Sequence, residues 1–384
     1  MLKECFDNVR KSVPLVHNIT NYVTVNDVAN IILACGASPI MSDEPDDVTD
    51  ITSICSSLNI NIGTLHKSSI EAMYLAGKRA NELGHPILLD PVGAGASALR
   101  TNTAVGLMEQ LQLTVIRGNI SEIKTLANGN GTTKGVDADV ADKVTDDTLD
   151  EAILFVKKFA AQSKAIIAVT GAIDLVSDGT RCYVIRNGRP EMGQITGTGC
   201  QLSGLMTAFV AANPSNQLDA AAAAVCAMGL AGEIGYSHMK DGDGNSTYRN
   251  RIIDAIYNMD GDSLEKGAKY DKDLLLYAVT DRYWLGERTL HDVVKESLDG
   301  GVTFVQLREK HLDQAHFLEE AKDLKMLCKA YNVPFVINDN VDIALEMDAD
   351  GVHVGQSDME AGDVRAKLGP DKIIGVSAQT VEQA

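Results

Sequence analysis

A glycine-rich stretch, Gln194-Ile-Thr-Gly-Thr-Gly-Cys200, has the composition of an anion-binding turn. The apolar, small-residue segment 201–212 that follows predicts a helix, so several unpaired backbone N–H groups would converge at the helix start. These donors and the helix dipole suit a phosphate group in transfer. Cys200 would lie in the first helical turn, where a thiol loses its proton more easily. The simpler alternative is a tight strand-to-helix turn followed by a buried cysteine.

Polar residues follow three of the strands predicted upstream of this turn. Asp90 ends one strand, Arg117 ends the next with Glu122 close behind, and Thr170 follows a third. Strands alternating with helices predict a mainly parallel sheet, in which chemistry gathers beyond the carboxyl ends of the strands. Carboxylates for Mg²⁺ and a cation for phosphate would then share one edge. Each residue also has an ordinary alternative: turn closure at Asp90, a helix-start acid at Glu122 and a hairpin turn at Thr170.

A second pattern begins after a polar, glycine-containing segment at 261–272, which predicts a linker. Five strand–helix units of about 25 residues each follow, which predicts a partial TIM barrel. Their strand ends again carry acids, amides and cations, typical of barrel-top sites, although strand ends are often polar for no functional reason. The strands are expected at 274–281, 302–310, 334–340, 351–356 and 372–377.

Composition restricts the classes of partner. A net charge of −19 over 384 residues disfavours binding to nucleic acid or anionic membranes. The seven cysteines form no CxxC pair, which favours free thiols in a reducing compartment. Residues 1–16 contain no apolar signal segment, and the apolar run 220–231 is too short to span a bilayer. A buried helix is expected there, and a cytoplasmic location for the protein.

Six ordered stretches show that residues 1 to about 265 resemble hydroxyethylthiazole kinase, of the ribokinase-like superfamily. The stretches are Leu15-Val-His-Asn-Ile-Thr-Asn21, Gly36-Ala-Ser-Pro-Ile-Met41, Asp90-Pro-Val-Gly-Ala-Gly95, Arg117-Gly-Asn-Ile-Ser-Glu122, Val169-Thr-Gly171 and Thr196-Gly-Thr-Gly-Cys200. The resemblance implies a three-layer α/β/α domain over residues 1–262. It also implies phosphorylation of the primary alcohol of 4-methyl-5-(2-hydroxyethyl)thiazole with MgATP.

The resemblance assigns roles to matching residues: Asn21, Met41 and Gly197 for the thiazole, Arg117 and Thr170 for ATP, Asp90 and Glu122 for Mg²⁺, and Cys200 for catalysis. Cys200 stands where most sugar kinases of the superfamily carry a catalytic aspartate. Because phosphoryl transfer to an alcohol needs little general-base help, Cys200 could be a base or could mainly position the hydroxyl. Kinases of this family form trimers, so a homotrimer through this domain is expected.

Residues 273–384 resemble thiamine phosphate synthase through Tyr277-Ala-Val-Thr-Asp281, Gln306-Leu-Arg-Glu-Lys310, Ile337-Asn-Asp339, Gly351-Val-His-Val-Gly-Gln-Ser-Asp358 and Gly375-Val-Ser377. That family joins hydroxymethylpyrimidine diphosphate to thiazole phosphate and releases pyrophosphate. The residues implied are Gln306, Arg308, Lys310, Asn338 and Ser377 for the pyrimidine diphosphate, and Asp339 and Asp358 for Mg²⁺. The product of the first domain would be a substrate of the second, as in a multifunctional enzyme of thiamine biosynthesis.

The synthase resemblance covers only the first five of the eight barrel units. The family's later strands, with a threonine-rich phosphate loop and its lysine, are absent, as in a fragment of a longer fusion. We therefore expect kinase activity without synthase activity in this chain. Two alternatives remain: the C-terminal piece is a non-catalytic binding module, or the kinase acts on another small alcohol.

Overall fold

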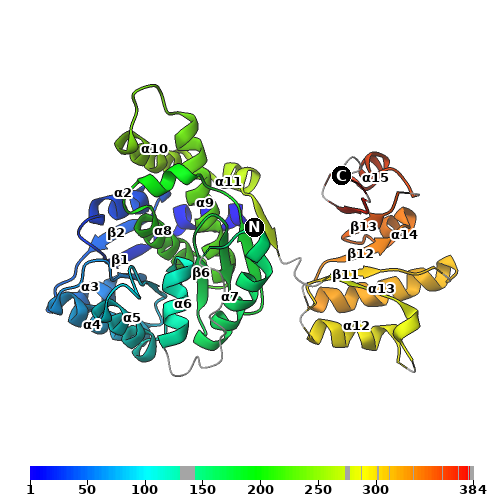
Figure 1. The fold of residues 1–384 in the computed structure, drawn as a ribbon, viewed down its shortest axis with the longest axis horizontal. Coiled ribbons are helices and arrows are strands. Elements are labelled where there is room, and N and C mark those ends of the chain that lie inside the picture. Colours follow the sequence, from blue (N-terminus) through cyan, green and yellow to red (C-terminus); the bar gives the residue numbers. More distant parts are fainter. Residues whose placement is uncertain are drawn as a thin grey trace. The chain divides into compact units, whose positions relative to one another are not determined.

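The structure is a computed structural model that describes residues 1–129, 143–272, 277–286, 288–300, 302–310, 312–331, 333–356, 358–370, 372–378 and 380. The chain divides into two compact units, Met1–Lys272 and Asp273–Ala384 (Figure 1). The start of the strand predicted at 274–281 lies outside the described residues.

The first unit is built on a nine-stranded sheet with the order β2-β1-β3-β4-β5-β6-β7-β8-β9. Strands β1 to β6 run parallel, and β7 to β9 continue the sheet in antiparallel pairs. The central strands are buried on both faces, as expected of a parallel sheet covered by helices. The strands are β1 (Leu15–Ile19), β2 (Ser38–Met41), β3 (Ser57–Asn61), β4 (Ile87–Asp90), β5 (Val115–Gly118), β6 (Ile166–Val169), β7 (Asp174–Ser177), β8 (Cys182–Ile185) and β9 (Tyr270–Lys272).

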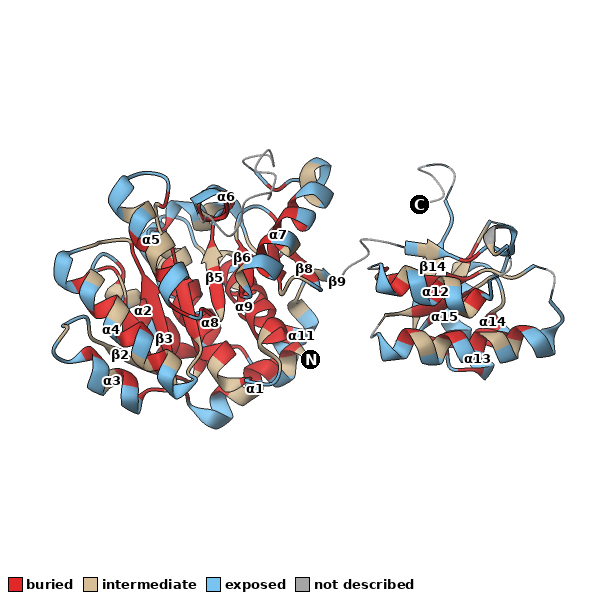
Figure 2. Ribbon diagram, turned by 90° about the horizontal axis from the view of Figure 1, so that it is seen from below, coloured by how far each residue is buried: buried red, intermediate tan, exposed pale blue. Residues whose placement is uncertain are grey.

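Helices cover both faces of this sheet, and the buried residues concentrate on the sheet and on helices α8 and α9 (Figure 2). One layer contains α1 (Leu2–Ser12), α2 (Val25–Cys35), α8 (Thr198–Ala212), α9 (Gln217–Ser237), α10 (Asn245–Asn258) and α11 (Gly261–Gly267). The other contains α3 (Val48–Ile54), α4 (Lys67–Leu83), α5 (Ala98–Gln110), α6 (Ile120–Gly129) and α7 (Leu149–Ser163). The predicted three-layer α/β/α fold is confirmed.

Helix α9 is nearly all apolar because it lies inside the first unit. Among the described residues it is the one helix whose length and composition alone would allow it to cross a membrane, and 89% of its apolar window is buried in the protein. Residues 220–231 within it are buried, so the prediction of a buried helix there is confirmed.

The linker predicted at 261–272 is wrong. Asp260 caps α11 by accepting the backbone N–H of Ser263 at 2.8 Å, and Leu264 is buried against the rest of the unit. Residues 270–272 then form β9, which pairs with β8. The polar, glycine-containing composition therefore belongs to a short capped helix and an edge strand of the first unit.

The second unit is a five-stranded, fully parallel sheet with the order β10-β11-β12-β13-β14. The prediction of a partial, barrel-like parallel sheet is confirmed, with five strands and four α-helices among the described residues. Within that part of the chain, β10 and β14 each pair on one side only. The strands are β10 (Tyr277–Val279), β11 (Phe304–Leu307), β12 (Phe335–Asn338), β13 (Gly351–Val354) and β14 (Ile373–Val376). The helices are α12 (Leu290–Asp299), α13 (Gln314–Ala330), α14 (Val341–Glu346) and α15 (Ala361–Leu368).

Candidate active site

The carboxyl ends of β3, β4, β5 and β6 bring polar residues to one edge of the first sheet. Asn61 lies opposite Asp90 in the register of β3 and β4, and Gly118 lies opposite Val169 in that of β5 and β6. Helix α8 packs on β1, β3 and β4, and its first turn meets this edge. The shared edge predicted from the parallel sheet is therefore where Asp90, Arg117 and Cys200 lie.

Asp90 is fully buried, and its hydrogen bonds with neighbouring side chains are made through one carboxylate oxygen, Oδ2. Oδ2 accepts hydrogen bonds from Asn61 Nδ2 at 2.8 Å and Ser203 Oγ at 2.8 Å, and it lies 3.5 Å from Arg117 Nη1. Burial raises the pKa of Asp90, while Arg117 and Ser203 oppose the rise. Oδ1 has no hydrogen-bond partner among the described residues. A buried carboxylate oxygen left in this state fits a ligand of a hard cation such as Mg²⁺.

Glu122 lies in the first turn of α6 and ties two loops together. Its Oε1 accepts the backbone N–H of Gly93 and its Oε2 that of Asn119, both at 2.8 Å. Its negative charge helps to raise the pKa of Asp90. The described residues contain no group of three or more His, Cys, Asp or Glu side chains that could hold a metal. Two carboxylates suffice for Mg²⁺ when phosphate oxygens and water complete its shell.

Arg117 extends from β5 toward a cavity of about 700 Å³. Its Nη2 donates to Thr170 Oγ1 at 2.6 Å, and Thr170 and Gly199 line the same cavity. Thr170 belongs to the turn between the antiparallel strands β6 and β7, so the hairpin turn considered for it is also present. Burial raises the pKa of Asp174, across this turn, to about 7. A planar cation beside a hydroxyl at a helix start is suited to phosphate oxygens.

Cys200 lies in the first turn of α8, as predicted, and Gly197 caps the helix with φ +86°. Its Sγ accepts hydrogen bonds from Asn21 Nδ2 at 3.1 Å and Asn61 Nδ2 at 3.2 Å. The prediction that this thiol loses its proton easily is wrong. Burial and then the charge of Asp90 raise its pKa, and they outweigh the hydrogen bonds from neighbouring side chains. Like the other six cysteines, it is buried and forms no disulfide.

The three residues expected to contact the thiazole, Asn21, Met41 and Gly197, have different surroundings. Asn21 uses both side-chain hydrogens inside the protein, on Asn61 Oδ1 and Cys200 Sγ. Gly197 lies so close to Thr24 that a Cβ on it would meet the Thr24 methyl at 2.2 Å. Met41 ends β2, the outer neighbour of β1. Asn21 and Gly197 thus border the Cys200 turn, and Met41 shares the same strand-end edge.

Two residues of the site were not predicted from the sequence, Asn61 and Ser203. Asn61 is the second asparagine of the Asn59-Ile-Asn61 alternation in a buried strand, a pattern that places both amides on one face. Ser203 lies three residues after Cys200, on the same face of α8. Both patterns could have revealed these residues.

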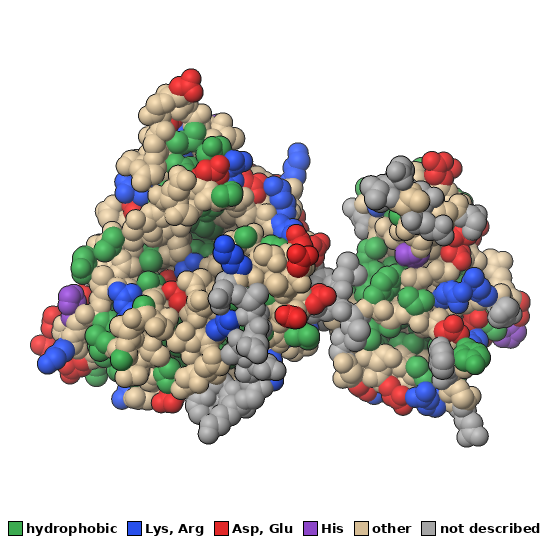
Figure 3. Space-filling view, viewed as in Figure 1, with side chains coloured by type: hydrophobic (Ala, Val, Ile, Leu, Met, Phe, Trp, Pro, Cys, Tyr) green, Lys and Arg blue, Asp and Glu red, His purple; other side chains and the backbone are tan. Residues whose placement is uncertain are grey.

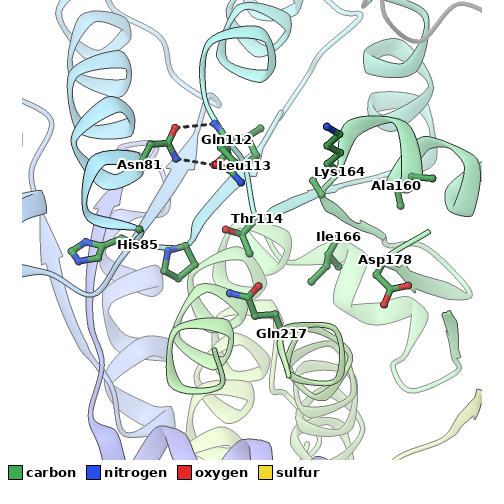
Figure 4. A pocket seen from close by; sticks show the side chains of 14 residues that line it. Asn81, His85, Gln112, Leu113, Thr114, Ala160, Lys164, Ile166, Asp178 and Gln217 are labelled. Carbon is green, nitrogen blue, oxygen red and sulfur yellow. Dashed lines mark hydrogen bonds between the residues drawn. The ribbon is translucent and has the colours of Figure 1, made fainter. Parts of the chain in front are cut away.

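A separate cavity of about 490 Å³ lies at the amino ends of β4, β5 and β6 (Figure 4). Asn81 and Gln112 close one side of it, because the Asn81 amide donates to the Gln112 carbonyl and accepts its backbone N–H. Residues that precede the strands line it, including Pro86, Thr114 and Ala165. It therefore opens at the edge opposite Cys200 and takes no part in the site.

In the second unit, the ends of β11 and β12 form a polar cluster. Gln306 Oε1 accepts the Tyr277 hydroxyl at 2.6 Å, and Gln306 Nε2 donates to Asn338 Oδ1. Arg308 Nη1 lies 3.8 Å from Asp281 Oδ2, and Lys310 is exposed beside this edge. The structure brings Gln306 and Asn338 into direct contact.

Asp339 and Asp358 also meet at the strand ends of the second unit. Burial raises the pKa of Asp339, and so do a hydrogen bond with Asp358 and its charge. Asp339 has φ +62°, a left-handed backbone that is costly for a non-glycine residue and often marks a site. Gly355 N donates to Asp358 Oδ2 at 2.7 Å, and Ser377 Oγ lies 2.9 Å from His353 Nε2. Two interacting carboxylates are the donor set that Mg²⁺ prefers.

Comparison with known proteins identifies the first unit. Residues 6–262 match the model of the hydroxyethylthiazole kinase family. Hydroxyethylthiazole kinase from Clostridium acetobutylicum is 59% identical over 271 residues, which are 71% of this chain and 99% of that protein. This chain belongs to the hydroxyethylthiazole kinase family. The predicted kinase, a transferase, is thereby confirmed.

Other hydroxyethylthiazole kinases agree in extent. The one from Ruminiclostridium cellulolyticum is 49% identical and matches 66% of this chain and 90% of its own length. The structure of a hydroxyethylthiazole kinase protein from Pyrococcus horikoshii OT3 is 33% identical, with a TM-score of 0.63, and it matches 71% of this chain and 98% of that one. The ribokinase-like class predicted for the first domain of this family member is confirmed.

Residues 276–384 match the model of thiamine monophosphate synthase. Thiamine phosphate pyrophosphorylase from Pyrococcus furiosus is 37% identical over 28% of this chain, with a TM-score of 0.26, and the segment spans 52% of that structure. A hydroxyethylthiazole kinase joined to a synthase-like segment belongs to thiamine biosynthesis, as predicted.

Proposed function

We propose that the first unit transfers the γ-phosphoryl group of ATP to the primary alcohol of 4-methyl-5-(2-hydroxyethyl)thiazole. The observation that carries this proposal is the convergence of Asp90, Arg117 and Cys200 at the start of α8, beside a cavity of about 700 Å³. Membership of the hydroxyethylthiazole kinase family supports the choice of alcohol.

Arg117 and Thr170 would bind the nucleotide phosphates. Arg117 offers a planar, permanently charged fork, and its hydrogen bond to Thr170 holds that fork at the cavity wall. The backbone N–H groups of residues 197–200 point from the start of α8, where they would stabilise charge on the transferred group.

Asp90 and Glu122 would hold Mg²⁺, and the free Oδ1 of Asp90 supports this role. The cation would neutralise the charge on the β- and γ-phosphates. Glu122 already holds two loop amides, so it also fixes the distance between the β4 turn and α6. Side-chain hydrogen bonds from Asn61 and Ser203 fix the carboxylate of Asp90 in place.

Cys200 would position the alcohol without removing the proton of its hydroxyl group. The raised pKa keeps the thiol protonated at neutral pH, so it is unsuited to act as a base. A loose phosphoryl-transfer transition state needs little removal of the alcohol proton. That proton can leave on the phosphomonoester, whose second pKa is about 6.

A direct assay tests the kinase proposal. The purified chain is given ATP, Mg²⁺ and a panel of small primary alcohols, and ADP release is followed. The thiazole alcohol is expected to give the highest kcat/KM. A higher value with an unrelated alcohol would favour the alternative substrate. ADP release at a rate that does not depend on any added alcohol would contradict the proposal.

We further propose that this 384-residue chain makes no thiamine phosphate. The support is the five-stranded sheet of the second unit, whose edge strands β10 and β14 expose Tyr277, Val279, Ile373 and Val376 by 39–48%. A closed barrel would bury the inward side chains and complete the phosphate-binding loops. Gln306, Arg308, Lys310, Asn338 and Ser377 would still form a site for the pyrimidine diphosphate, with Asp339 and Asp358 on Mg²⁺.

The synthase test supplies the thiazole alcohol, ATP, Mg²⁺ and the pyrimidine diphosphate together. Thiazole phosphate should accumulate without thiamine phosphate. Binding of the pyrimidine diphosphate without turnover would favour a binding module, and steady formation of thiamine phosphate would refute the proposal.

A homotrimer through the first unit is also proposed, with no nucleic-acid partner. Tyr22 and Val23 are 68% and 59% exposed directly beside Asn21, and Tyr22 stacks on His66. An interface at this place would bury these two side chains. Acidic and basic side chains are interspersed on the face drawn in Figure 3. The net charge of −19 disfavours a nucleic-acid partner. Light scattering on the purified chain measures the assembly, and a monomer at micromolar concentration would contradict it.

A further inference from the structure

Asn61 lies between the two groups that flank the reaction in the proposed function. One hydrogen of its Nδ2 points to Asp90 Oδ2 at 2.8 Å and the other to Cys200 Sγ at 3.2 Å. Its Oδ1 accepts Asn21 Nδ2 at 3.1 Å and the backbone N–H of Gly63 at 2.9 Å. All four hydrogen-bonding positions of this buried amide are therefore used.

The orientation of the Asn61 amide follows from its neighbours. A charged Asp90 only accepts hydrogen bonds, and the backbone N–H of Gly63 only donates. Turning the amide over would place two acceptors together at Asp90 and two donors together at Gly63. The Nδ2 group must therefore face Asp90 and Cys200.

Asn21 closes a three-membered ring with Asn61 and Cys200. Its Nδ2 donates to Cys200 Sγ at 3.1 Å and to Asn61 Oδ1. Two amides from different segments, the end of β3 and the loop after β1, thus hold one sulfur atom from two directions. Sulfur held in this way cannot move without breaking a hydrogen bond in a buried site, where an unpaired amide is costly.

We propose that Asn61 is a positioning residue for phosphoryl transfer, which holds the sulfur of Cys200 at a fixed place relative to the carboxylate of Asp90. This inference rests on the proposed function, in which Cys200 orients the alcohol and Asp90 helps to bind Mg²⁺. Misplacing a reacting group by about 1 Å can cost on the order of 10²-fold in rate. Loss of Asn61 should therefore lower kcat and leave binding of the alcohol nearly unchanged.

Asn59 offers a matched control for this residue. It lies two positions earlier on β3, hence on the same face, and is equally buried. Its Nδ2 donates to Asn18 Oδ1 at 3.0 Å, and Asp90 and Cys200 are not among its hydrogen-bond partners. Asn61→Ala should lower kcat by a factor of about 10, close to the loss expected of Cys200→Ala, with KM for the alcohol within about threefold. Asn59→Ala should keep kcat within about threefold, although it should lower thermal stability about as much as Asn61→Ala does. Equal kcat values for the two variants would overturn the proposal.

A double-mutant cycle then tests whether Asn61 acts through Cys200. In a Cys200→Ala background, Asn61→Ala should cost less than about threefold in kcat, because the sulfur it positions is gone. The same loss in both backgrounds would show that Asn61 acts without Cys200, and would overturn the proposal.

A measurement without substrate separates this inference from the proposed function. Alkylation of Cys200 by iodoacetamide is followed by peptide mass spectrometry over a range of pH. Because Asn61 donates to the sulfur, Asn61→Ala should raise the pH at half-maximal alkylation, and Asn59→Ala should not. A midpoint unchanged by Asn61→Ala would contradict the contact itself. A raised midpoint in a chain that fails to phosphorylate the thiazole would leave the contact standing and refute the proposed reaction.

Discussion

The guanidinium of Arg117 lies directly against Gly199. A Cβ built on Gly199 would come within 2.6 Å of Arg117 Nη1 and 2.7 Å of Nη2. The same guanidinium also contacts Asp90 and Thr170, so a shift away from Gly199 would disturb both of these contacts. The glycine at position 199 therefore sets the place of the cation as well as the path of the turn.

Gly199→Ala should displace Arg117 and weaken nucleotide binding. We expect KM for ATP to rise by about tenfold or more, in line with the loss of a charged hydrogen bond worth about 1.5–3 kcal/mol. Steady-state kinetics measure it. Gly244→Ala is the control, since a Cβ at Gly244 meets no heavy atom within 4 Å. An unchanged KM in Gly199→Ala would remove Arg117 from the nucleotide site.

Glu122→Gln keeps the size of the side chain but removes its charge and one of its acceptors. The new NH₂ group would face a backbone N–H, of either Gly93 or Asn119. We expect kcat to fall by a factor on the order of 10² or more. Glu109→Gln, an exposed position on α5, should be neutral. Turnover near wild type at saturating Mg²⁺ would exclude Glu122 from the site.

Cys200→Asp should remain active. The Nδ2 groups that now donate to the sulfur, from Asn21 and Asn61, can donate equally to a carboxylate. Cys200→Ala should be slower by roughly tenfold, with thiazole binding little changed. If both variants have the kcat and KM of the wild type, the position is structural only.

Asp174 should make stability depend on pH. Burial raises its pKa from 3.8 to about 7, so the folded state binds more protons than the unfolded state between these values. The stability that protonation of Asp174 contributes to the folded state is therefore lost as pH rises through this window. Asp174→Asn keeps an acceptor for the Gly171 N–H and removes the titration. From about pH 5 to about pH 8 the Tm of the wild type should fall by roughly 5–10 °C relative to the variant. Parallel Tm curves would contradict the raised pKa.

The second unit should be the less stable one, and residues 273–384 expressed alone should aggregate or be cut rapidly by proteases. Each large apolar side chain left unburied forfeits roughly 1.5–3 kcal/mol, against a domain stability of about 5–15 kcal/mol. Tyr277, Val279, Ile373 and Val376 are exposed at the sheet edges. Limited proteolysis of the whole chain should cleave beyond Lys272 first. Equal resistance of both units would contradict this prediction.

Sequence patterns predicted well the positions of those residues that follow from strand order, while their roles stay predictions. Asp90, Arg117 and Thr170 end or follow neighbouring parallel strands, so one rule about sheet edges brings them together. Asn61 follows no such rule. Its partners lie 29 and 139 residues away, and only the register of β3 and the packing of α8 bring them within reach.

Two predictions failed because a local rule was overridden by tertiary structure. Cys200 does lie at a helix start, but burial and the charge of Asp90 are properties of the folded site and raise its pKa. The stretch 261–272 has the composition of a linker, but Asp260 caps a helix there and β8 accepts residues 270–272 as a neighbouring strand. Asp90 is far in sequence from Cys200, and β8 is far from residues 270–272. Only the capping Asp260 adjoins the segment that it affects.

The edge strand β9 determines where the chain can be divided. Residues 270–272 pair with Tyr183, Val184 and Ile185 of β8 and belong to the sheet of the kinase, although the family model ends at residue 262. A shortened gene that stopped at 262 would strip this strand and open the flank of β8 to intermolecular pairing. A stand-alone kinase, or a chimera carrying a different second domain, should therefore be spliced after Lys272.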